Sequence, residues 1–159
     1  MRIVAEPLTP EAFAPFGDVL QPPVRAGRTY FDAGLANGRP DARPSISLSR
    51  ITPLDRLPLR ATMLERHEHS SQSFVPIVVG RWLVIVAPPA PDGGPDATRA
   101  RAFVAGPGQG ITYHMGTWHH GMTVLDREAQ FAVFMWRDGT PGDEEFVPLA
   151  APFDVVLPD

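Results

Sequence analysis

The sequence contains no cysteine and no lysine, and each absence excludes several kinds of chemistry. Without cysteine there is no disulfide, no thiolate nucleophile, no iron–sulfur cluster and no zinc site with sulfur ligands. Without lysine there is no catalytic Schiff base, no anchor for pyridoxal phosphate and no P-loop for a nucleotide phosphate. All 14 basic side chains are arginines, so these exclusions follow from the composition alone.

Charge and long apolar runs are also scarce. Charged residues make up 20% of the chain and the formal net charge is -4, which argues against a nucleic-acid partner because such partners require a basic face. A few local arginines still allow a small anionic metabolite to bind. We find no apolar run of 18 residues and no signal-peptide pattern, so we expect a cytoplasmic protein without a membrane span.

Turn-forming residues, in contrast, are abundant. The 19 prolines and 14 glycines separate short runs rich in Val, Ile, Phe and Thr, a pattern typical of an all-β fold. The length fits one domain, and we expect a single domain over residues 1–159. About nine short strands with short connections favour a closed barrel or jelly roll, which leaves no free sheet edges.

Local patterns predict where the elements lie. Thr9 is a suitable N-cap and Pro10 a suitable first residue for one short N-terminal helix over residues 10–16. Gly80-Arg81 predicts a two-residue hairpin turn between strands 73–79 and 82–87. Residues 21–44 are expected to form a surface segment over one mouth of the barrel. The other expected strands are residues 1–8, 45–51, 60–69, 100–105, 110–113, 121–125 and 129–136.

The histidines are concentrated in two short segments. The first holds His67 and His69, and the second holds His114, His119 and His120. Residues two apart in a strand share a face, so Glu65, His67 and His69 are expected to project together into the barrel. His119 and His120 are adjacent, so only one of them can enter the same cavity. The sequence therefore predicts one polar site that both segments share.

Two motifs resemble those of the cupin superfamily. His67-Glu68-His69, followed by Gly80, is similar to the first cupin motif, in which two histidines precede a glutamate and a glycine. The segment 116–119, Gly-Thr-Trp-His, is similar to the end of the second motif. Ser73 stands at the spacing of the motif's glutamate, so the usual site of three histidines and one carboxylate is incomplete.

A closer resemblance is to the ureidoglycolate lyase family. It is carried by Leu64-Glu65-Arg66-His67, by Gln72-Ser73-Phe74-Val75-Pro76 and by residues 113–120, Tyr-His-Met-Gly-Thr-Trp-His-His. The match runs in order over nearly the whole chain and weakens after about Trp136. Within it His67 looks shared by the family, whereas His69 looks like an addition.

This resemblance implies a fold, an activity and a cofactor. The fold is a cupin-like β-barrel (jelly roll), and the assembly is a homodimer. The activity is a carbon–nitrogen lyase of allantoin and purine nitrogen catabolism, which eliminates urea from (S)-ureidoglycolate to give glyoxylate. A divalent metal is also implied, with nickel suggested by the family and zinc, iron or manganese equally suited to histidine and oxygen donors.

The reaction would need a base near the hydroxyl, an acid near the leaving nitrogen and a cation for the carboxylate. The metal-ligand candidates are His67, His69 and His119. The catalytic candidates are His114, His119, Glu65 and Tyr113. The substrate-binding candidates are Arg50, Arg66, Gln72 and Ser47. One arginine, Arg50 as the first candidate and Arg66 as the second, would bind the carboxylate by its two-pronged guanidinium, and Gln72 would bind urea or a metal.

Three other functions fit parts of the same pattern. A cupin oxygenase or isomerase would use iron or manganese, and Ser73 in place of the glutamate counts against it. A small-molecule-binding cupin without enzymatic activity is the second alternative. The third is amidohydrolysis of the same substrate, which would release ammonia rather than urea.

Overall fold

The structure is a computed structural model that describes residues 1–158. Its helical elements in that range are α1 (Pro10–Phe13) and three 3-10 turns, η1 (Asp32–Gly34), η2 (Ala97–Arg99) and η3 (Pro141–Asp143). The strands are β1 (Arg2–Val4), β2 (Glu6–Pro7), β3 (Gly17–Leu20), β4 (Arg43–Ile51), β5 (Leu59–Arg66), β6 (Gln72–Val78), β7 (Trp82–Ala87), β8 (Arg101–Ala105), β9 (Gly110–Tyr113), β10 (Trp118–His119), β11 (Thr123–Val124), β12 (Ala129–Arg137) and β13 (Glu145–Val156).

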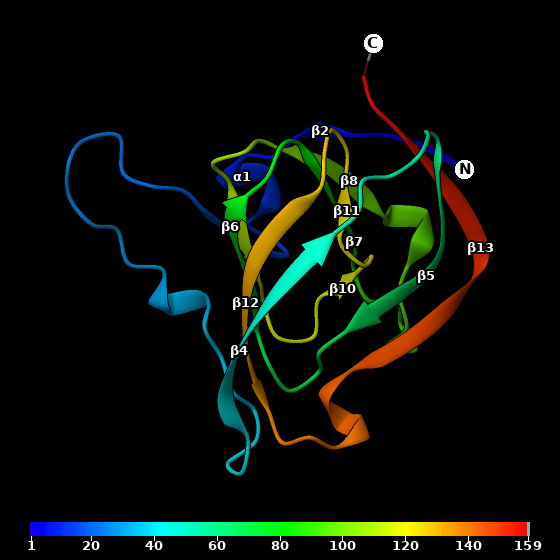
Figure 1. Ribbon diagram of the computed structural model, residues 1–159. Helices are drawn as coiled ribbons and strands as arrows, with labels where there is room; N and C mark the ends of the chain where they lie inside the picture. The colour runs from blue at the N-terminus through cyan, green and yellow to red at the C-terminus, as the bar shows by residue number, and fades with distance from the viewer. Residues whose placement is uncertain (159) are drawn as a thin grey trace.

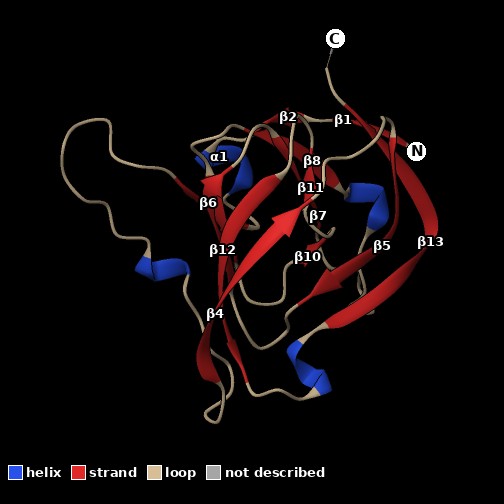
Figure 2. Ribbon diagram, in the orientation of Figure 1, coloured by secondary structure: helices blue, strands red, loops and turns tan. Residues whose placement is uncertain are grey.

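The strands form two sheets that face each other as the walls of a barrel (Figures 1 and 2). Sheet A has the order β1-β13-β5-β10-β7-β8-β2, with β11 also paired to β7, and sheet B has the order β3-β9-β6-β12-β4. The prediction of an all-β barrel with one short N-terminal helix is therefore confirmed. Within residues 1–158, no helix has the length and apolar character needed to cross a membrane.

The core follows from the alternation of side chains along the strands. On β7, Val84 and Val86 belong to the apolar cluster between the sheets, whereas Ile85 belongs to a second cluster on the other face of sheet A. Phe131 on β12 reaches across to Trp82, with ring centroids 5.0 Å apart in an edge-to-face arrangement. Tyr113 belongs to this interior cluster, and its ring also contacts the buried polar residue His119.

The N-terminal helix begins where it was predicted and ends earlier. The hydroxyl of Thr9 accepts a hydrogen bond from the Ala12 amide at 3.2 Å, and Pro10 is the first helical residue. The helix ends at Phe13, and a turn over residues 14–16 leads directly into β3. Burial of Phe13 in the core sets the position of this helix against the barrel.

The predicted Gly80-Arg81 hairpin is wrong, because β6 lies in sheet B and β7 in sheet A. The chain crosses between the sheets at this point, and no positive φ is needed at Gly80. Gly80 instead packs closely on Asp126, where an added Cβ would lie 3.1 Å from the Asp126 side chain. The same carboxylate accepts a 2.8 Å hydrogen bond from the Arg81 amide, which fixes the crossing.

Two other predictions also differ from the structure. The strand expected over residues 60–69 ends at Arg66, because a turn begins at His67 and the Ser70 amide points back to the His67 carbonyl. Residues 21–31 do not cover a mouth of the barrel but extend beyond its wall (Figure 1). Residues 36–38 then return to the molecule and bond to residues 69–71, the segment that follows His67.

Candidate active site

Two register pairs from the two sheets bring the polar residues together. In sheet A, His119 on β10 lies opposite Glu65 on β5, and in sheet B, Tyr113 on β9 lies opposite Gln72 on β6. The Tyr113 ring stacks on the His119 ring, with centroids 4.1 Å apart and planes inclined by 17°. His67, one residue beyond β5, adds a second imidazole with its ring centroid 5.4 Å from that of His119. The polar site therefore joins both walls of the barrel.

The two imidazoles are buried and oriented by the backbone. His67 is 5% exposed and His119 is 2% exposed. Nδ1 of His67 lies 2.8 Å from the Asp143 carbonyl oxygen, and Nδ1 of His119 lies 2.9 Å from the Thr117 carbonyl oxygen. A carbonyl oxygen can only accept, so Nδ1 carries the hydrogen in both rings. The Nε2 atom is the remaining ring nitrogen in each case, and neither Nε2 has a hydrogen-bond partner within the protein.

A carboxylate completes this arrangement. Oε1 of Glu65 lies 3.6 Å from Nε2 of His119. Glu65, His67 and His119 each offer one ligand atom, and these atoms all lie within 4.8 Å of one another. Two unpartnered imidazole nitrogens and one carboxylate oxygen are donors that suit a divalent transition metal, so the residues fit such an ion. Among residues 1–158, no other group of three or more His, Asp or Glu side chains is arranged so that it could hold a metal.

Burial controls the protonation of the site. Burial lowers the pKa of His119 to about 3, and the neighbouring His67 adds to this effect, so His119 is neutral at physiological pH. Burial raises the pKa of Glu65, against a smaller opposing effect of His67. Burial also raises the pKa of Tyr113, with a further contribution from the charge of Glu65, so its hydroxyl keeps its proton. The neutral imidazole of His119 beside a carboxylate with a raised pKa can bind an ion or exchange protons.

A small polar pocket lies beside His67, because Asp143, whose carbonyl binds the His67 ring, lines it. Gln72 is 9% exposed, its Oε1 has no hydrogen-bond partner, and its amide nitrogen lies 3.8 Å from the sulfur of Met135. Gln72 lines a pocket of about 180 Å³ together with Ser45, Ser47, Val133, Met135, Arg137, Asp143 and Glu144. The structure therefore brings Ser47 and Gln72, both predicted from the sequence, to the same pocket.

The sequence reasoning missed Arg137, the one arginine that lines this pocket. The signal was present in β12, where Ala129, Phe131, Val133 and Met135 are buried at alternate positions. Arg137 is the next member of that series, so its side chain leaves the strand on the interior side. Asp143 was also missed, because the prediction contained no element after about residue 136.

Three other predicted residues lie away from the imidazoles. Arg50 is 65% exposed at its side chain and pairs with Glu128 at 2.5 Å. Arg66 points to the other face of β5, where its guanidinium lies 4.5 Å from the centre of the Trp118 ring. His69 is 41% exposed at its side chain, because the turn after β5 ends the alternation that would have carried it inward.

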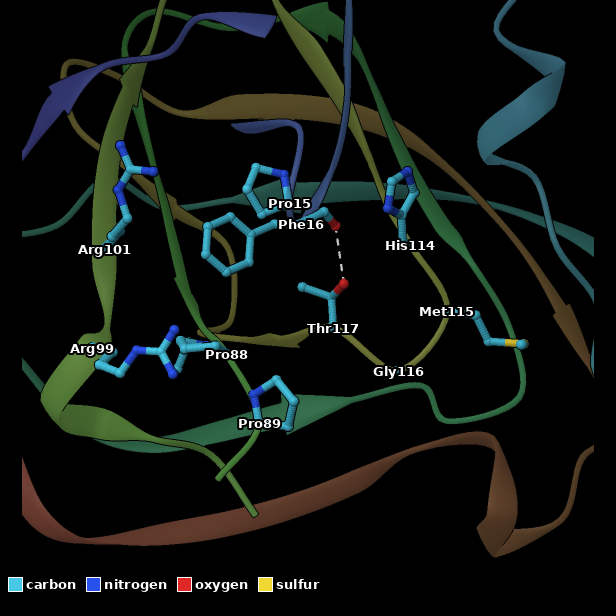
Figure 3. A pocket seen from close by; sticks show the side chains of 11 residues that line it. Pro15, Phe16, Pro88, Pro89, Arg99, Arg101, His114, Met115, Gly116 and Thr117 are labelled. Carbon is cyan, nitrogen blue, oxygen red and sulfur yellow. Dashed lines mark hydrogen bonds between the residues drawn. The ribbon is translucent and has the colours of Figure 1, made fainter. Parts of the chain in front are cut away.

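His114 faces a different pocket, of about 510 Å³, at one end of the barrel (Figure 3). Figure 3 shows its imidazole on one side of the pocket and Arg99 and Arg101 on the other. The basic side chains around it each have a carboxylate neighbour: His114 has Asp18 at 3.8 Å, Arg99 has Asp96 at 4.0 Å and Arg101 has Glu6 at 3.0 Å. This pocket does not include His67, His119 or Glu65.

Comparison with known proteins agrees with the resemblance noted in the sequence. A sequence model described as "Ureidoglycolate lyase" matches residues 1–155. The chain belongs to the ureidoglycolate lyase family. One relative in this family is a ureidoglycolate lyase of Chelativorans sp. (strain BNC1), 39% identical, with 99% of this chain and 98% of the relative covered. Another is a ureidoglycolate lyase of Mesorhizobium japonicum, 38% identical, with 99% of each chain covered.

A solved structure supports the fold of this family member. The dTDP sugar isomerase of Desulfovibrio desulfuricans G20 superposes with a TM-score of 0.50 at 17% sequence identity, covering 86% of this chain and 84% of that one. At this identity the likeness concerns the fold alone. Together with the two-sheet barrel, it confirms the cupin-like architecture predicted from the sequence.

Proposed function

We propose that this protein is a ureidoglycolate lyase, which eliminates urea from ureidoglycolate and leaves glyoxylate. Membership of the family and its relatives of that name support the activity. The observation that carries the proposal is the arrangement inside the barrel. Two buried imidazoles present unpartnered Nε2 atoms beside Glu65, a carboxylate whose pKa is raised.

The elimination needs one proton to move between two positions on the substrate. The hydroxyl loses its proton, a carbonyl forms on that carbon, the bond from the carbon to the urea nitrogen breaks, and this nitrogen gains a proton. We assign the proton transfer to Glu65, which accepts the hydroxyl proton and returns it to the leaving nitrogen. Its raised pKa suits a group that must be both base and acid near neutral pH.

The histidines would hold the reacting hydroxyl. Nε2 of His67 and Nε2 of His119 would hold a divalent metal, and the Glu65 carboxylate would stay beside it as the proton-transfer group. When bound, such an ion lowers the pKa of the hydroxyl that coordinates it. The Tyr113 ring stacks on His119 and keeps it in place. The Tyr113 hydroxyl keeps its proton and is a candidate hydrogen-bond donor to the substrate hydroxyl oxygen as that oxygen loses its own proton.

The polar pocket beside His67 would bind the two ends of the substrate. The unpartnered Oε1 of Gln72 can accept a hydrogen bond from a urea N–H group, and Ser47 offers a hydroxyl at the pocket wall. Arg137 is the candidate for the substrate carboxylate, because it lines this pocket and its side chain is 51% exposed, although its Nε also lies 3.5 Å from the Asp143 carboxylate. Arg50 and Arg66, the earlier candidates, do not line this pocket and lie instead beside Glu128 and the Trp118 ring.

A product assay tests the activity. Purified, chelator-treated protein is incubated with ureidoglycolate, with and without added nickel, zinc, iron or manganese, and spontaneous decay is subtracted. Urea and glyoxylate in equal amounts are the expected products. Ammonia in place of urea would assign the chain to amidohydrolysis, and binding without any product would assign it to the non-enzymatic cupins.

We also propose a homodimer formed through the outer face of sheet B. This face exposes large apolar side chains, with Ile46 74% exposed and Leu48 75% exposed on β4, and Val75, Ile77 and Val78 exposed on β6. Contiguous apolar surface of this kind is typical of an interface between protein chains. A Leu48→Glu variant is expected to sediment as a monomer, whereas a Val24→Glu variant, changed on the extended segment, is expected to remain a dimer.

A further inference from the structure

A buried carboxylate lies directly behind His67. Asp143 is 4% exposed, and no other Asp or Glu among residues 1–158 is buried. It ends η3, and its backbone carbonyl is the group that accepts the Nδ1 hydrogen of His67. The orientation of that carbonyl therefore sets the direction of Nε2 in the active site.

The side chain of Asp143 fixes this turn from several directions. One carboxylate oxygen accepts hydrogen bonds from Nη2 of Arg39 at 2.5 Å and from the Asp138 amide at 3.0 Å. The other accepts from the Gly139 amide at 2.9 Å. Gly139 has a φ of +80°, a backbone conformation that glycine adopts without strain. The carboxylate thus closes the loop between β12 and β13 into one conformation.

Arg39 ties this loop to a distant part of the chain. Its second nitrogen, Nη1, lies 2.8 Å from the Asp138 carboxylate, so one guanidinium bridges two carboxylates. The neighbouring Gly38 amide donates to the His69 carbonyl at 2.8 Å, which joins the same segment to the turn after His67. Burial alone would raise the pKa of Asp143, but the bonds from Arg39 and the backbone amides prevail and lower it to about 2. The pair is therefore charged at physiological pH.

We propose that Asp143 and Arg39 are positioning residues for His67, which hold the Asp143 carbonyl where it fixes the tautomer and direction of that imidazole. The inference builds on the proposed function, because it concerns the same site. It predicts an asymmetry between the two histidines. The Nδ1 hydrogen of His119 is accepted by the carbonyl of Thr117, two residues earlier in the chain, and Arg39 takes no part in this bond.

Two measurements on the whole protein test this asymmetry, and neither uses turnover. Long-range proton–nitrogen NMR correlations of the metal-free protein distinguish Nδ1–H from Nε2–H imidazoles. Wild-type protein is expected to show Nδ1–H tautomers for both His67 and His119. In Arg39→Met, and in Asp143→Asn, the His67 signal is expected to shift toward a tautomer mixture while the His119 signal stays unchanged.

The second measurement is titration with Co²⁺ alone, followed by its visible absorption. Loss of a partner that orients a metal-binding histidine typically weakens metal affinity by about 10- to 100-fold, and we expect this range for both variants. Arg39→Lys is expected to recover part of the affinity, because an ammonium can still pair with one carboxylate. The matched control is Arg81→Met, which removes another arginine–aspartate pair, with Asp126, whose bonds do not involve the site.

The outcomes separate a positioning role from a merely structural one. Unchanged His67 signals in both folded variants would overturn the proposal, as would equal shifts of His67 and His119. Failure of the proposed function appears differently, as wild-type protein that releases no urea while its two imidazoles still show the fixed tautomers.

Discussion

His67 and His119 differ from His69 and His114 in every property that matters for binding a ligand, although each pair contains one residue from either histidine segment. The first two are buried, and each is held by a bond from its Nδ1 to a backbone carbonyl. Neither Nε2 atom has a hydrogen-bond partner. The other two are more than 40% exposed at their side chains and lie 3.8 Å from a carboxylate of their own. The clustering of histidines in the sequence therefore indicated the region of the candidate site. The direction of each side chain in the folded protein determines which histidines belong to it.

The largest expected effect comes from removing one of the inward imidazoles. Changing His67 or His119 to alanine should lower kcat by at least ~100-fold, because a group that holds the reacting hydroxyl is lost. The matched variants His69→Ala and His114→Ala are expected to stay within about threefold of wild type, since neither side chain reaches that hydroxyl. Steady-state kinetics with circular dichroism as a control for folding measures all four. Near-normal activity in a folded His119→Ala protein would refute the assignment.

The same comparison can be made between two carboxylates, Glu65 in the candidate site and Glu68 on the exposed turn. Glu65→Gln keeps the shape of the side chain and removes its ability to exchange a proton, so kcat is expected to fall on the order of 100-fold. The paired control is Glu68→Gln, on the exposed turn that carries His69. Equal activities of the two variants would move the proton transfer to another group.

Two arginines on β4 and β12 extend the comparison to the substrate carboxylate. Arg137 lines the pocket beside His67, whereas Arg50 pairs with Glu128 at the surface. Arg137→Lys is expected to raise KM by about tenfold, because a two-pronged contact is replaced by a single ammonium. Arg50→Lys should leave KM within about twofold, since exposed pairs contribute little. A strong rise in KM for Arg50→Lys would restore the first sequence-based assignment.

The remaining expected effect concerns stability and not turnover, and it is a change in the free energy of unfolding with pH. Folding lowers the pKa of His119 from 6.5 to about 3, so below about pH 6.5 the unfolded chain takes up a proton that the folded protein excludes. The free energy of unfolding of metal-free protein should then fall by up to ~1.4 kcal/mol for each pH unit as the pH decreases. Glu65, with its raised pKa, acts in the opposite direction, so Glu65→Gln is the suitable background.

Urea unfolding between pH 7 and pH 5 measures this slope. In the Glu65→Gln background, a further His119→Gln change is expected to flatten it, whereas His114→Gln, on the exposed side, should not. Equal slopes in the two double variants would show that His119 is not the group that loses its proton affinity on folding.

Part of the fold could be read from local patterns. The strands expected over residues 45–51 and 129–136 correspond to β4 and β12, and Thr9 with Pro10 located the start of α1. The patterns failed where long-range pairing decides the outcome. β10 has only two residues, and it is a strand because β5 and β7 lie on either side of it. The Gly80-Arg81 segment looked like a hairpin because sequence spacing does not record a crossing between sheets.

The candidate site was predicted in the same uneven way. Glu65, His67, Gln72, Tyr113 and His119 were all named from the sequence, and the structure brings them together. His69 was expected beside His67 on the assumption that the strand continues, and the turn after Arg66 breaks that alternation. Arg137 and Asp143 were missed because the region after about residue 136 carried no motif, although β13 pairs along much of β5.

By itself, the sequence determined the available chemistry: histidine, carboxylate, amide and arginine groups without thiol or amine, in an all-β chain that resembles one enzyme family. Only the tertiary structure decided which groups face one another, because the spacing of residues fixes a side chain's direction only while a strand continues. Burial is equally a property of the folded barrel, and burial is what keeps His119 neutral and raises the pKa of Glu65.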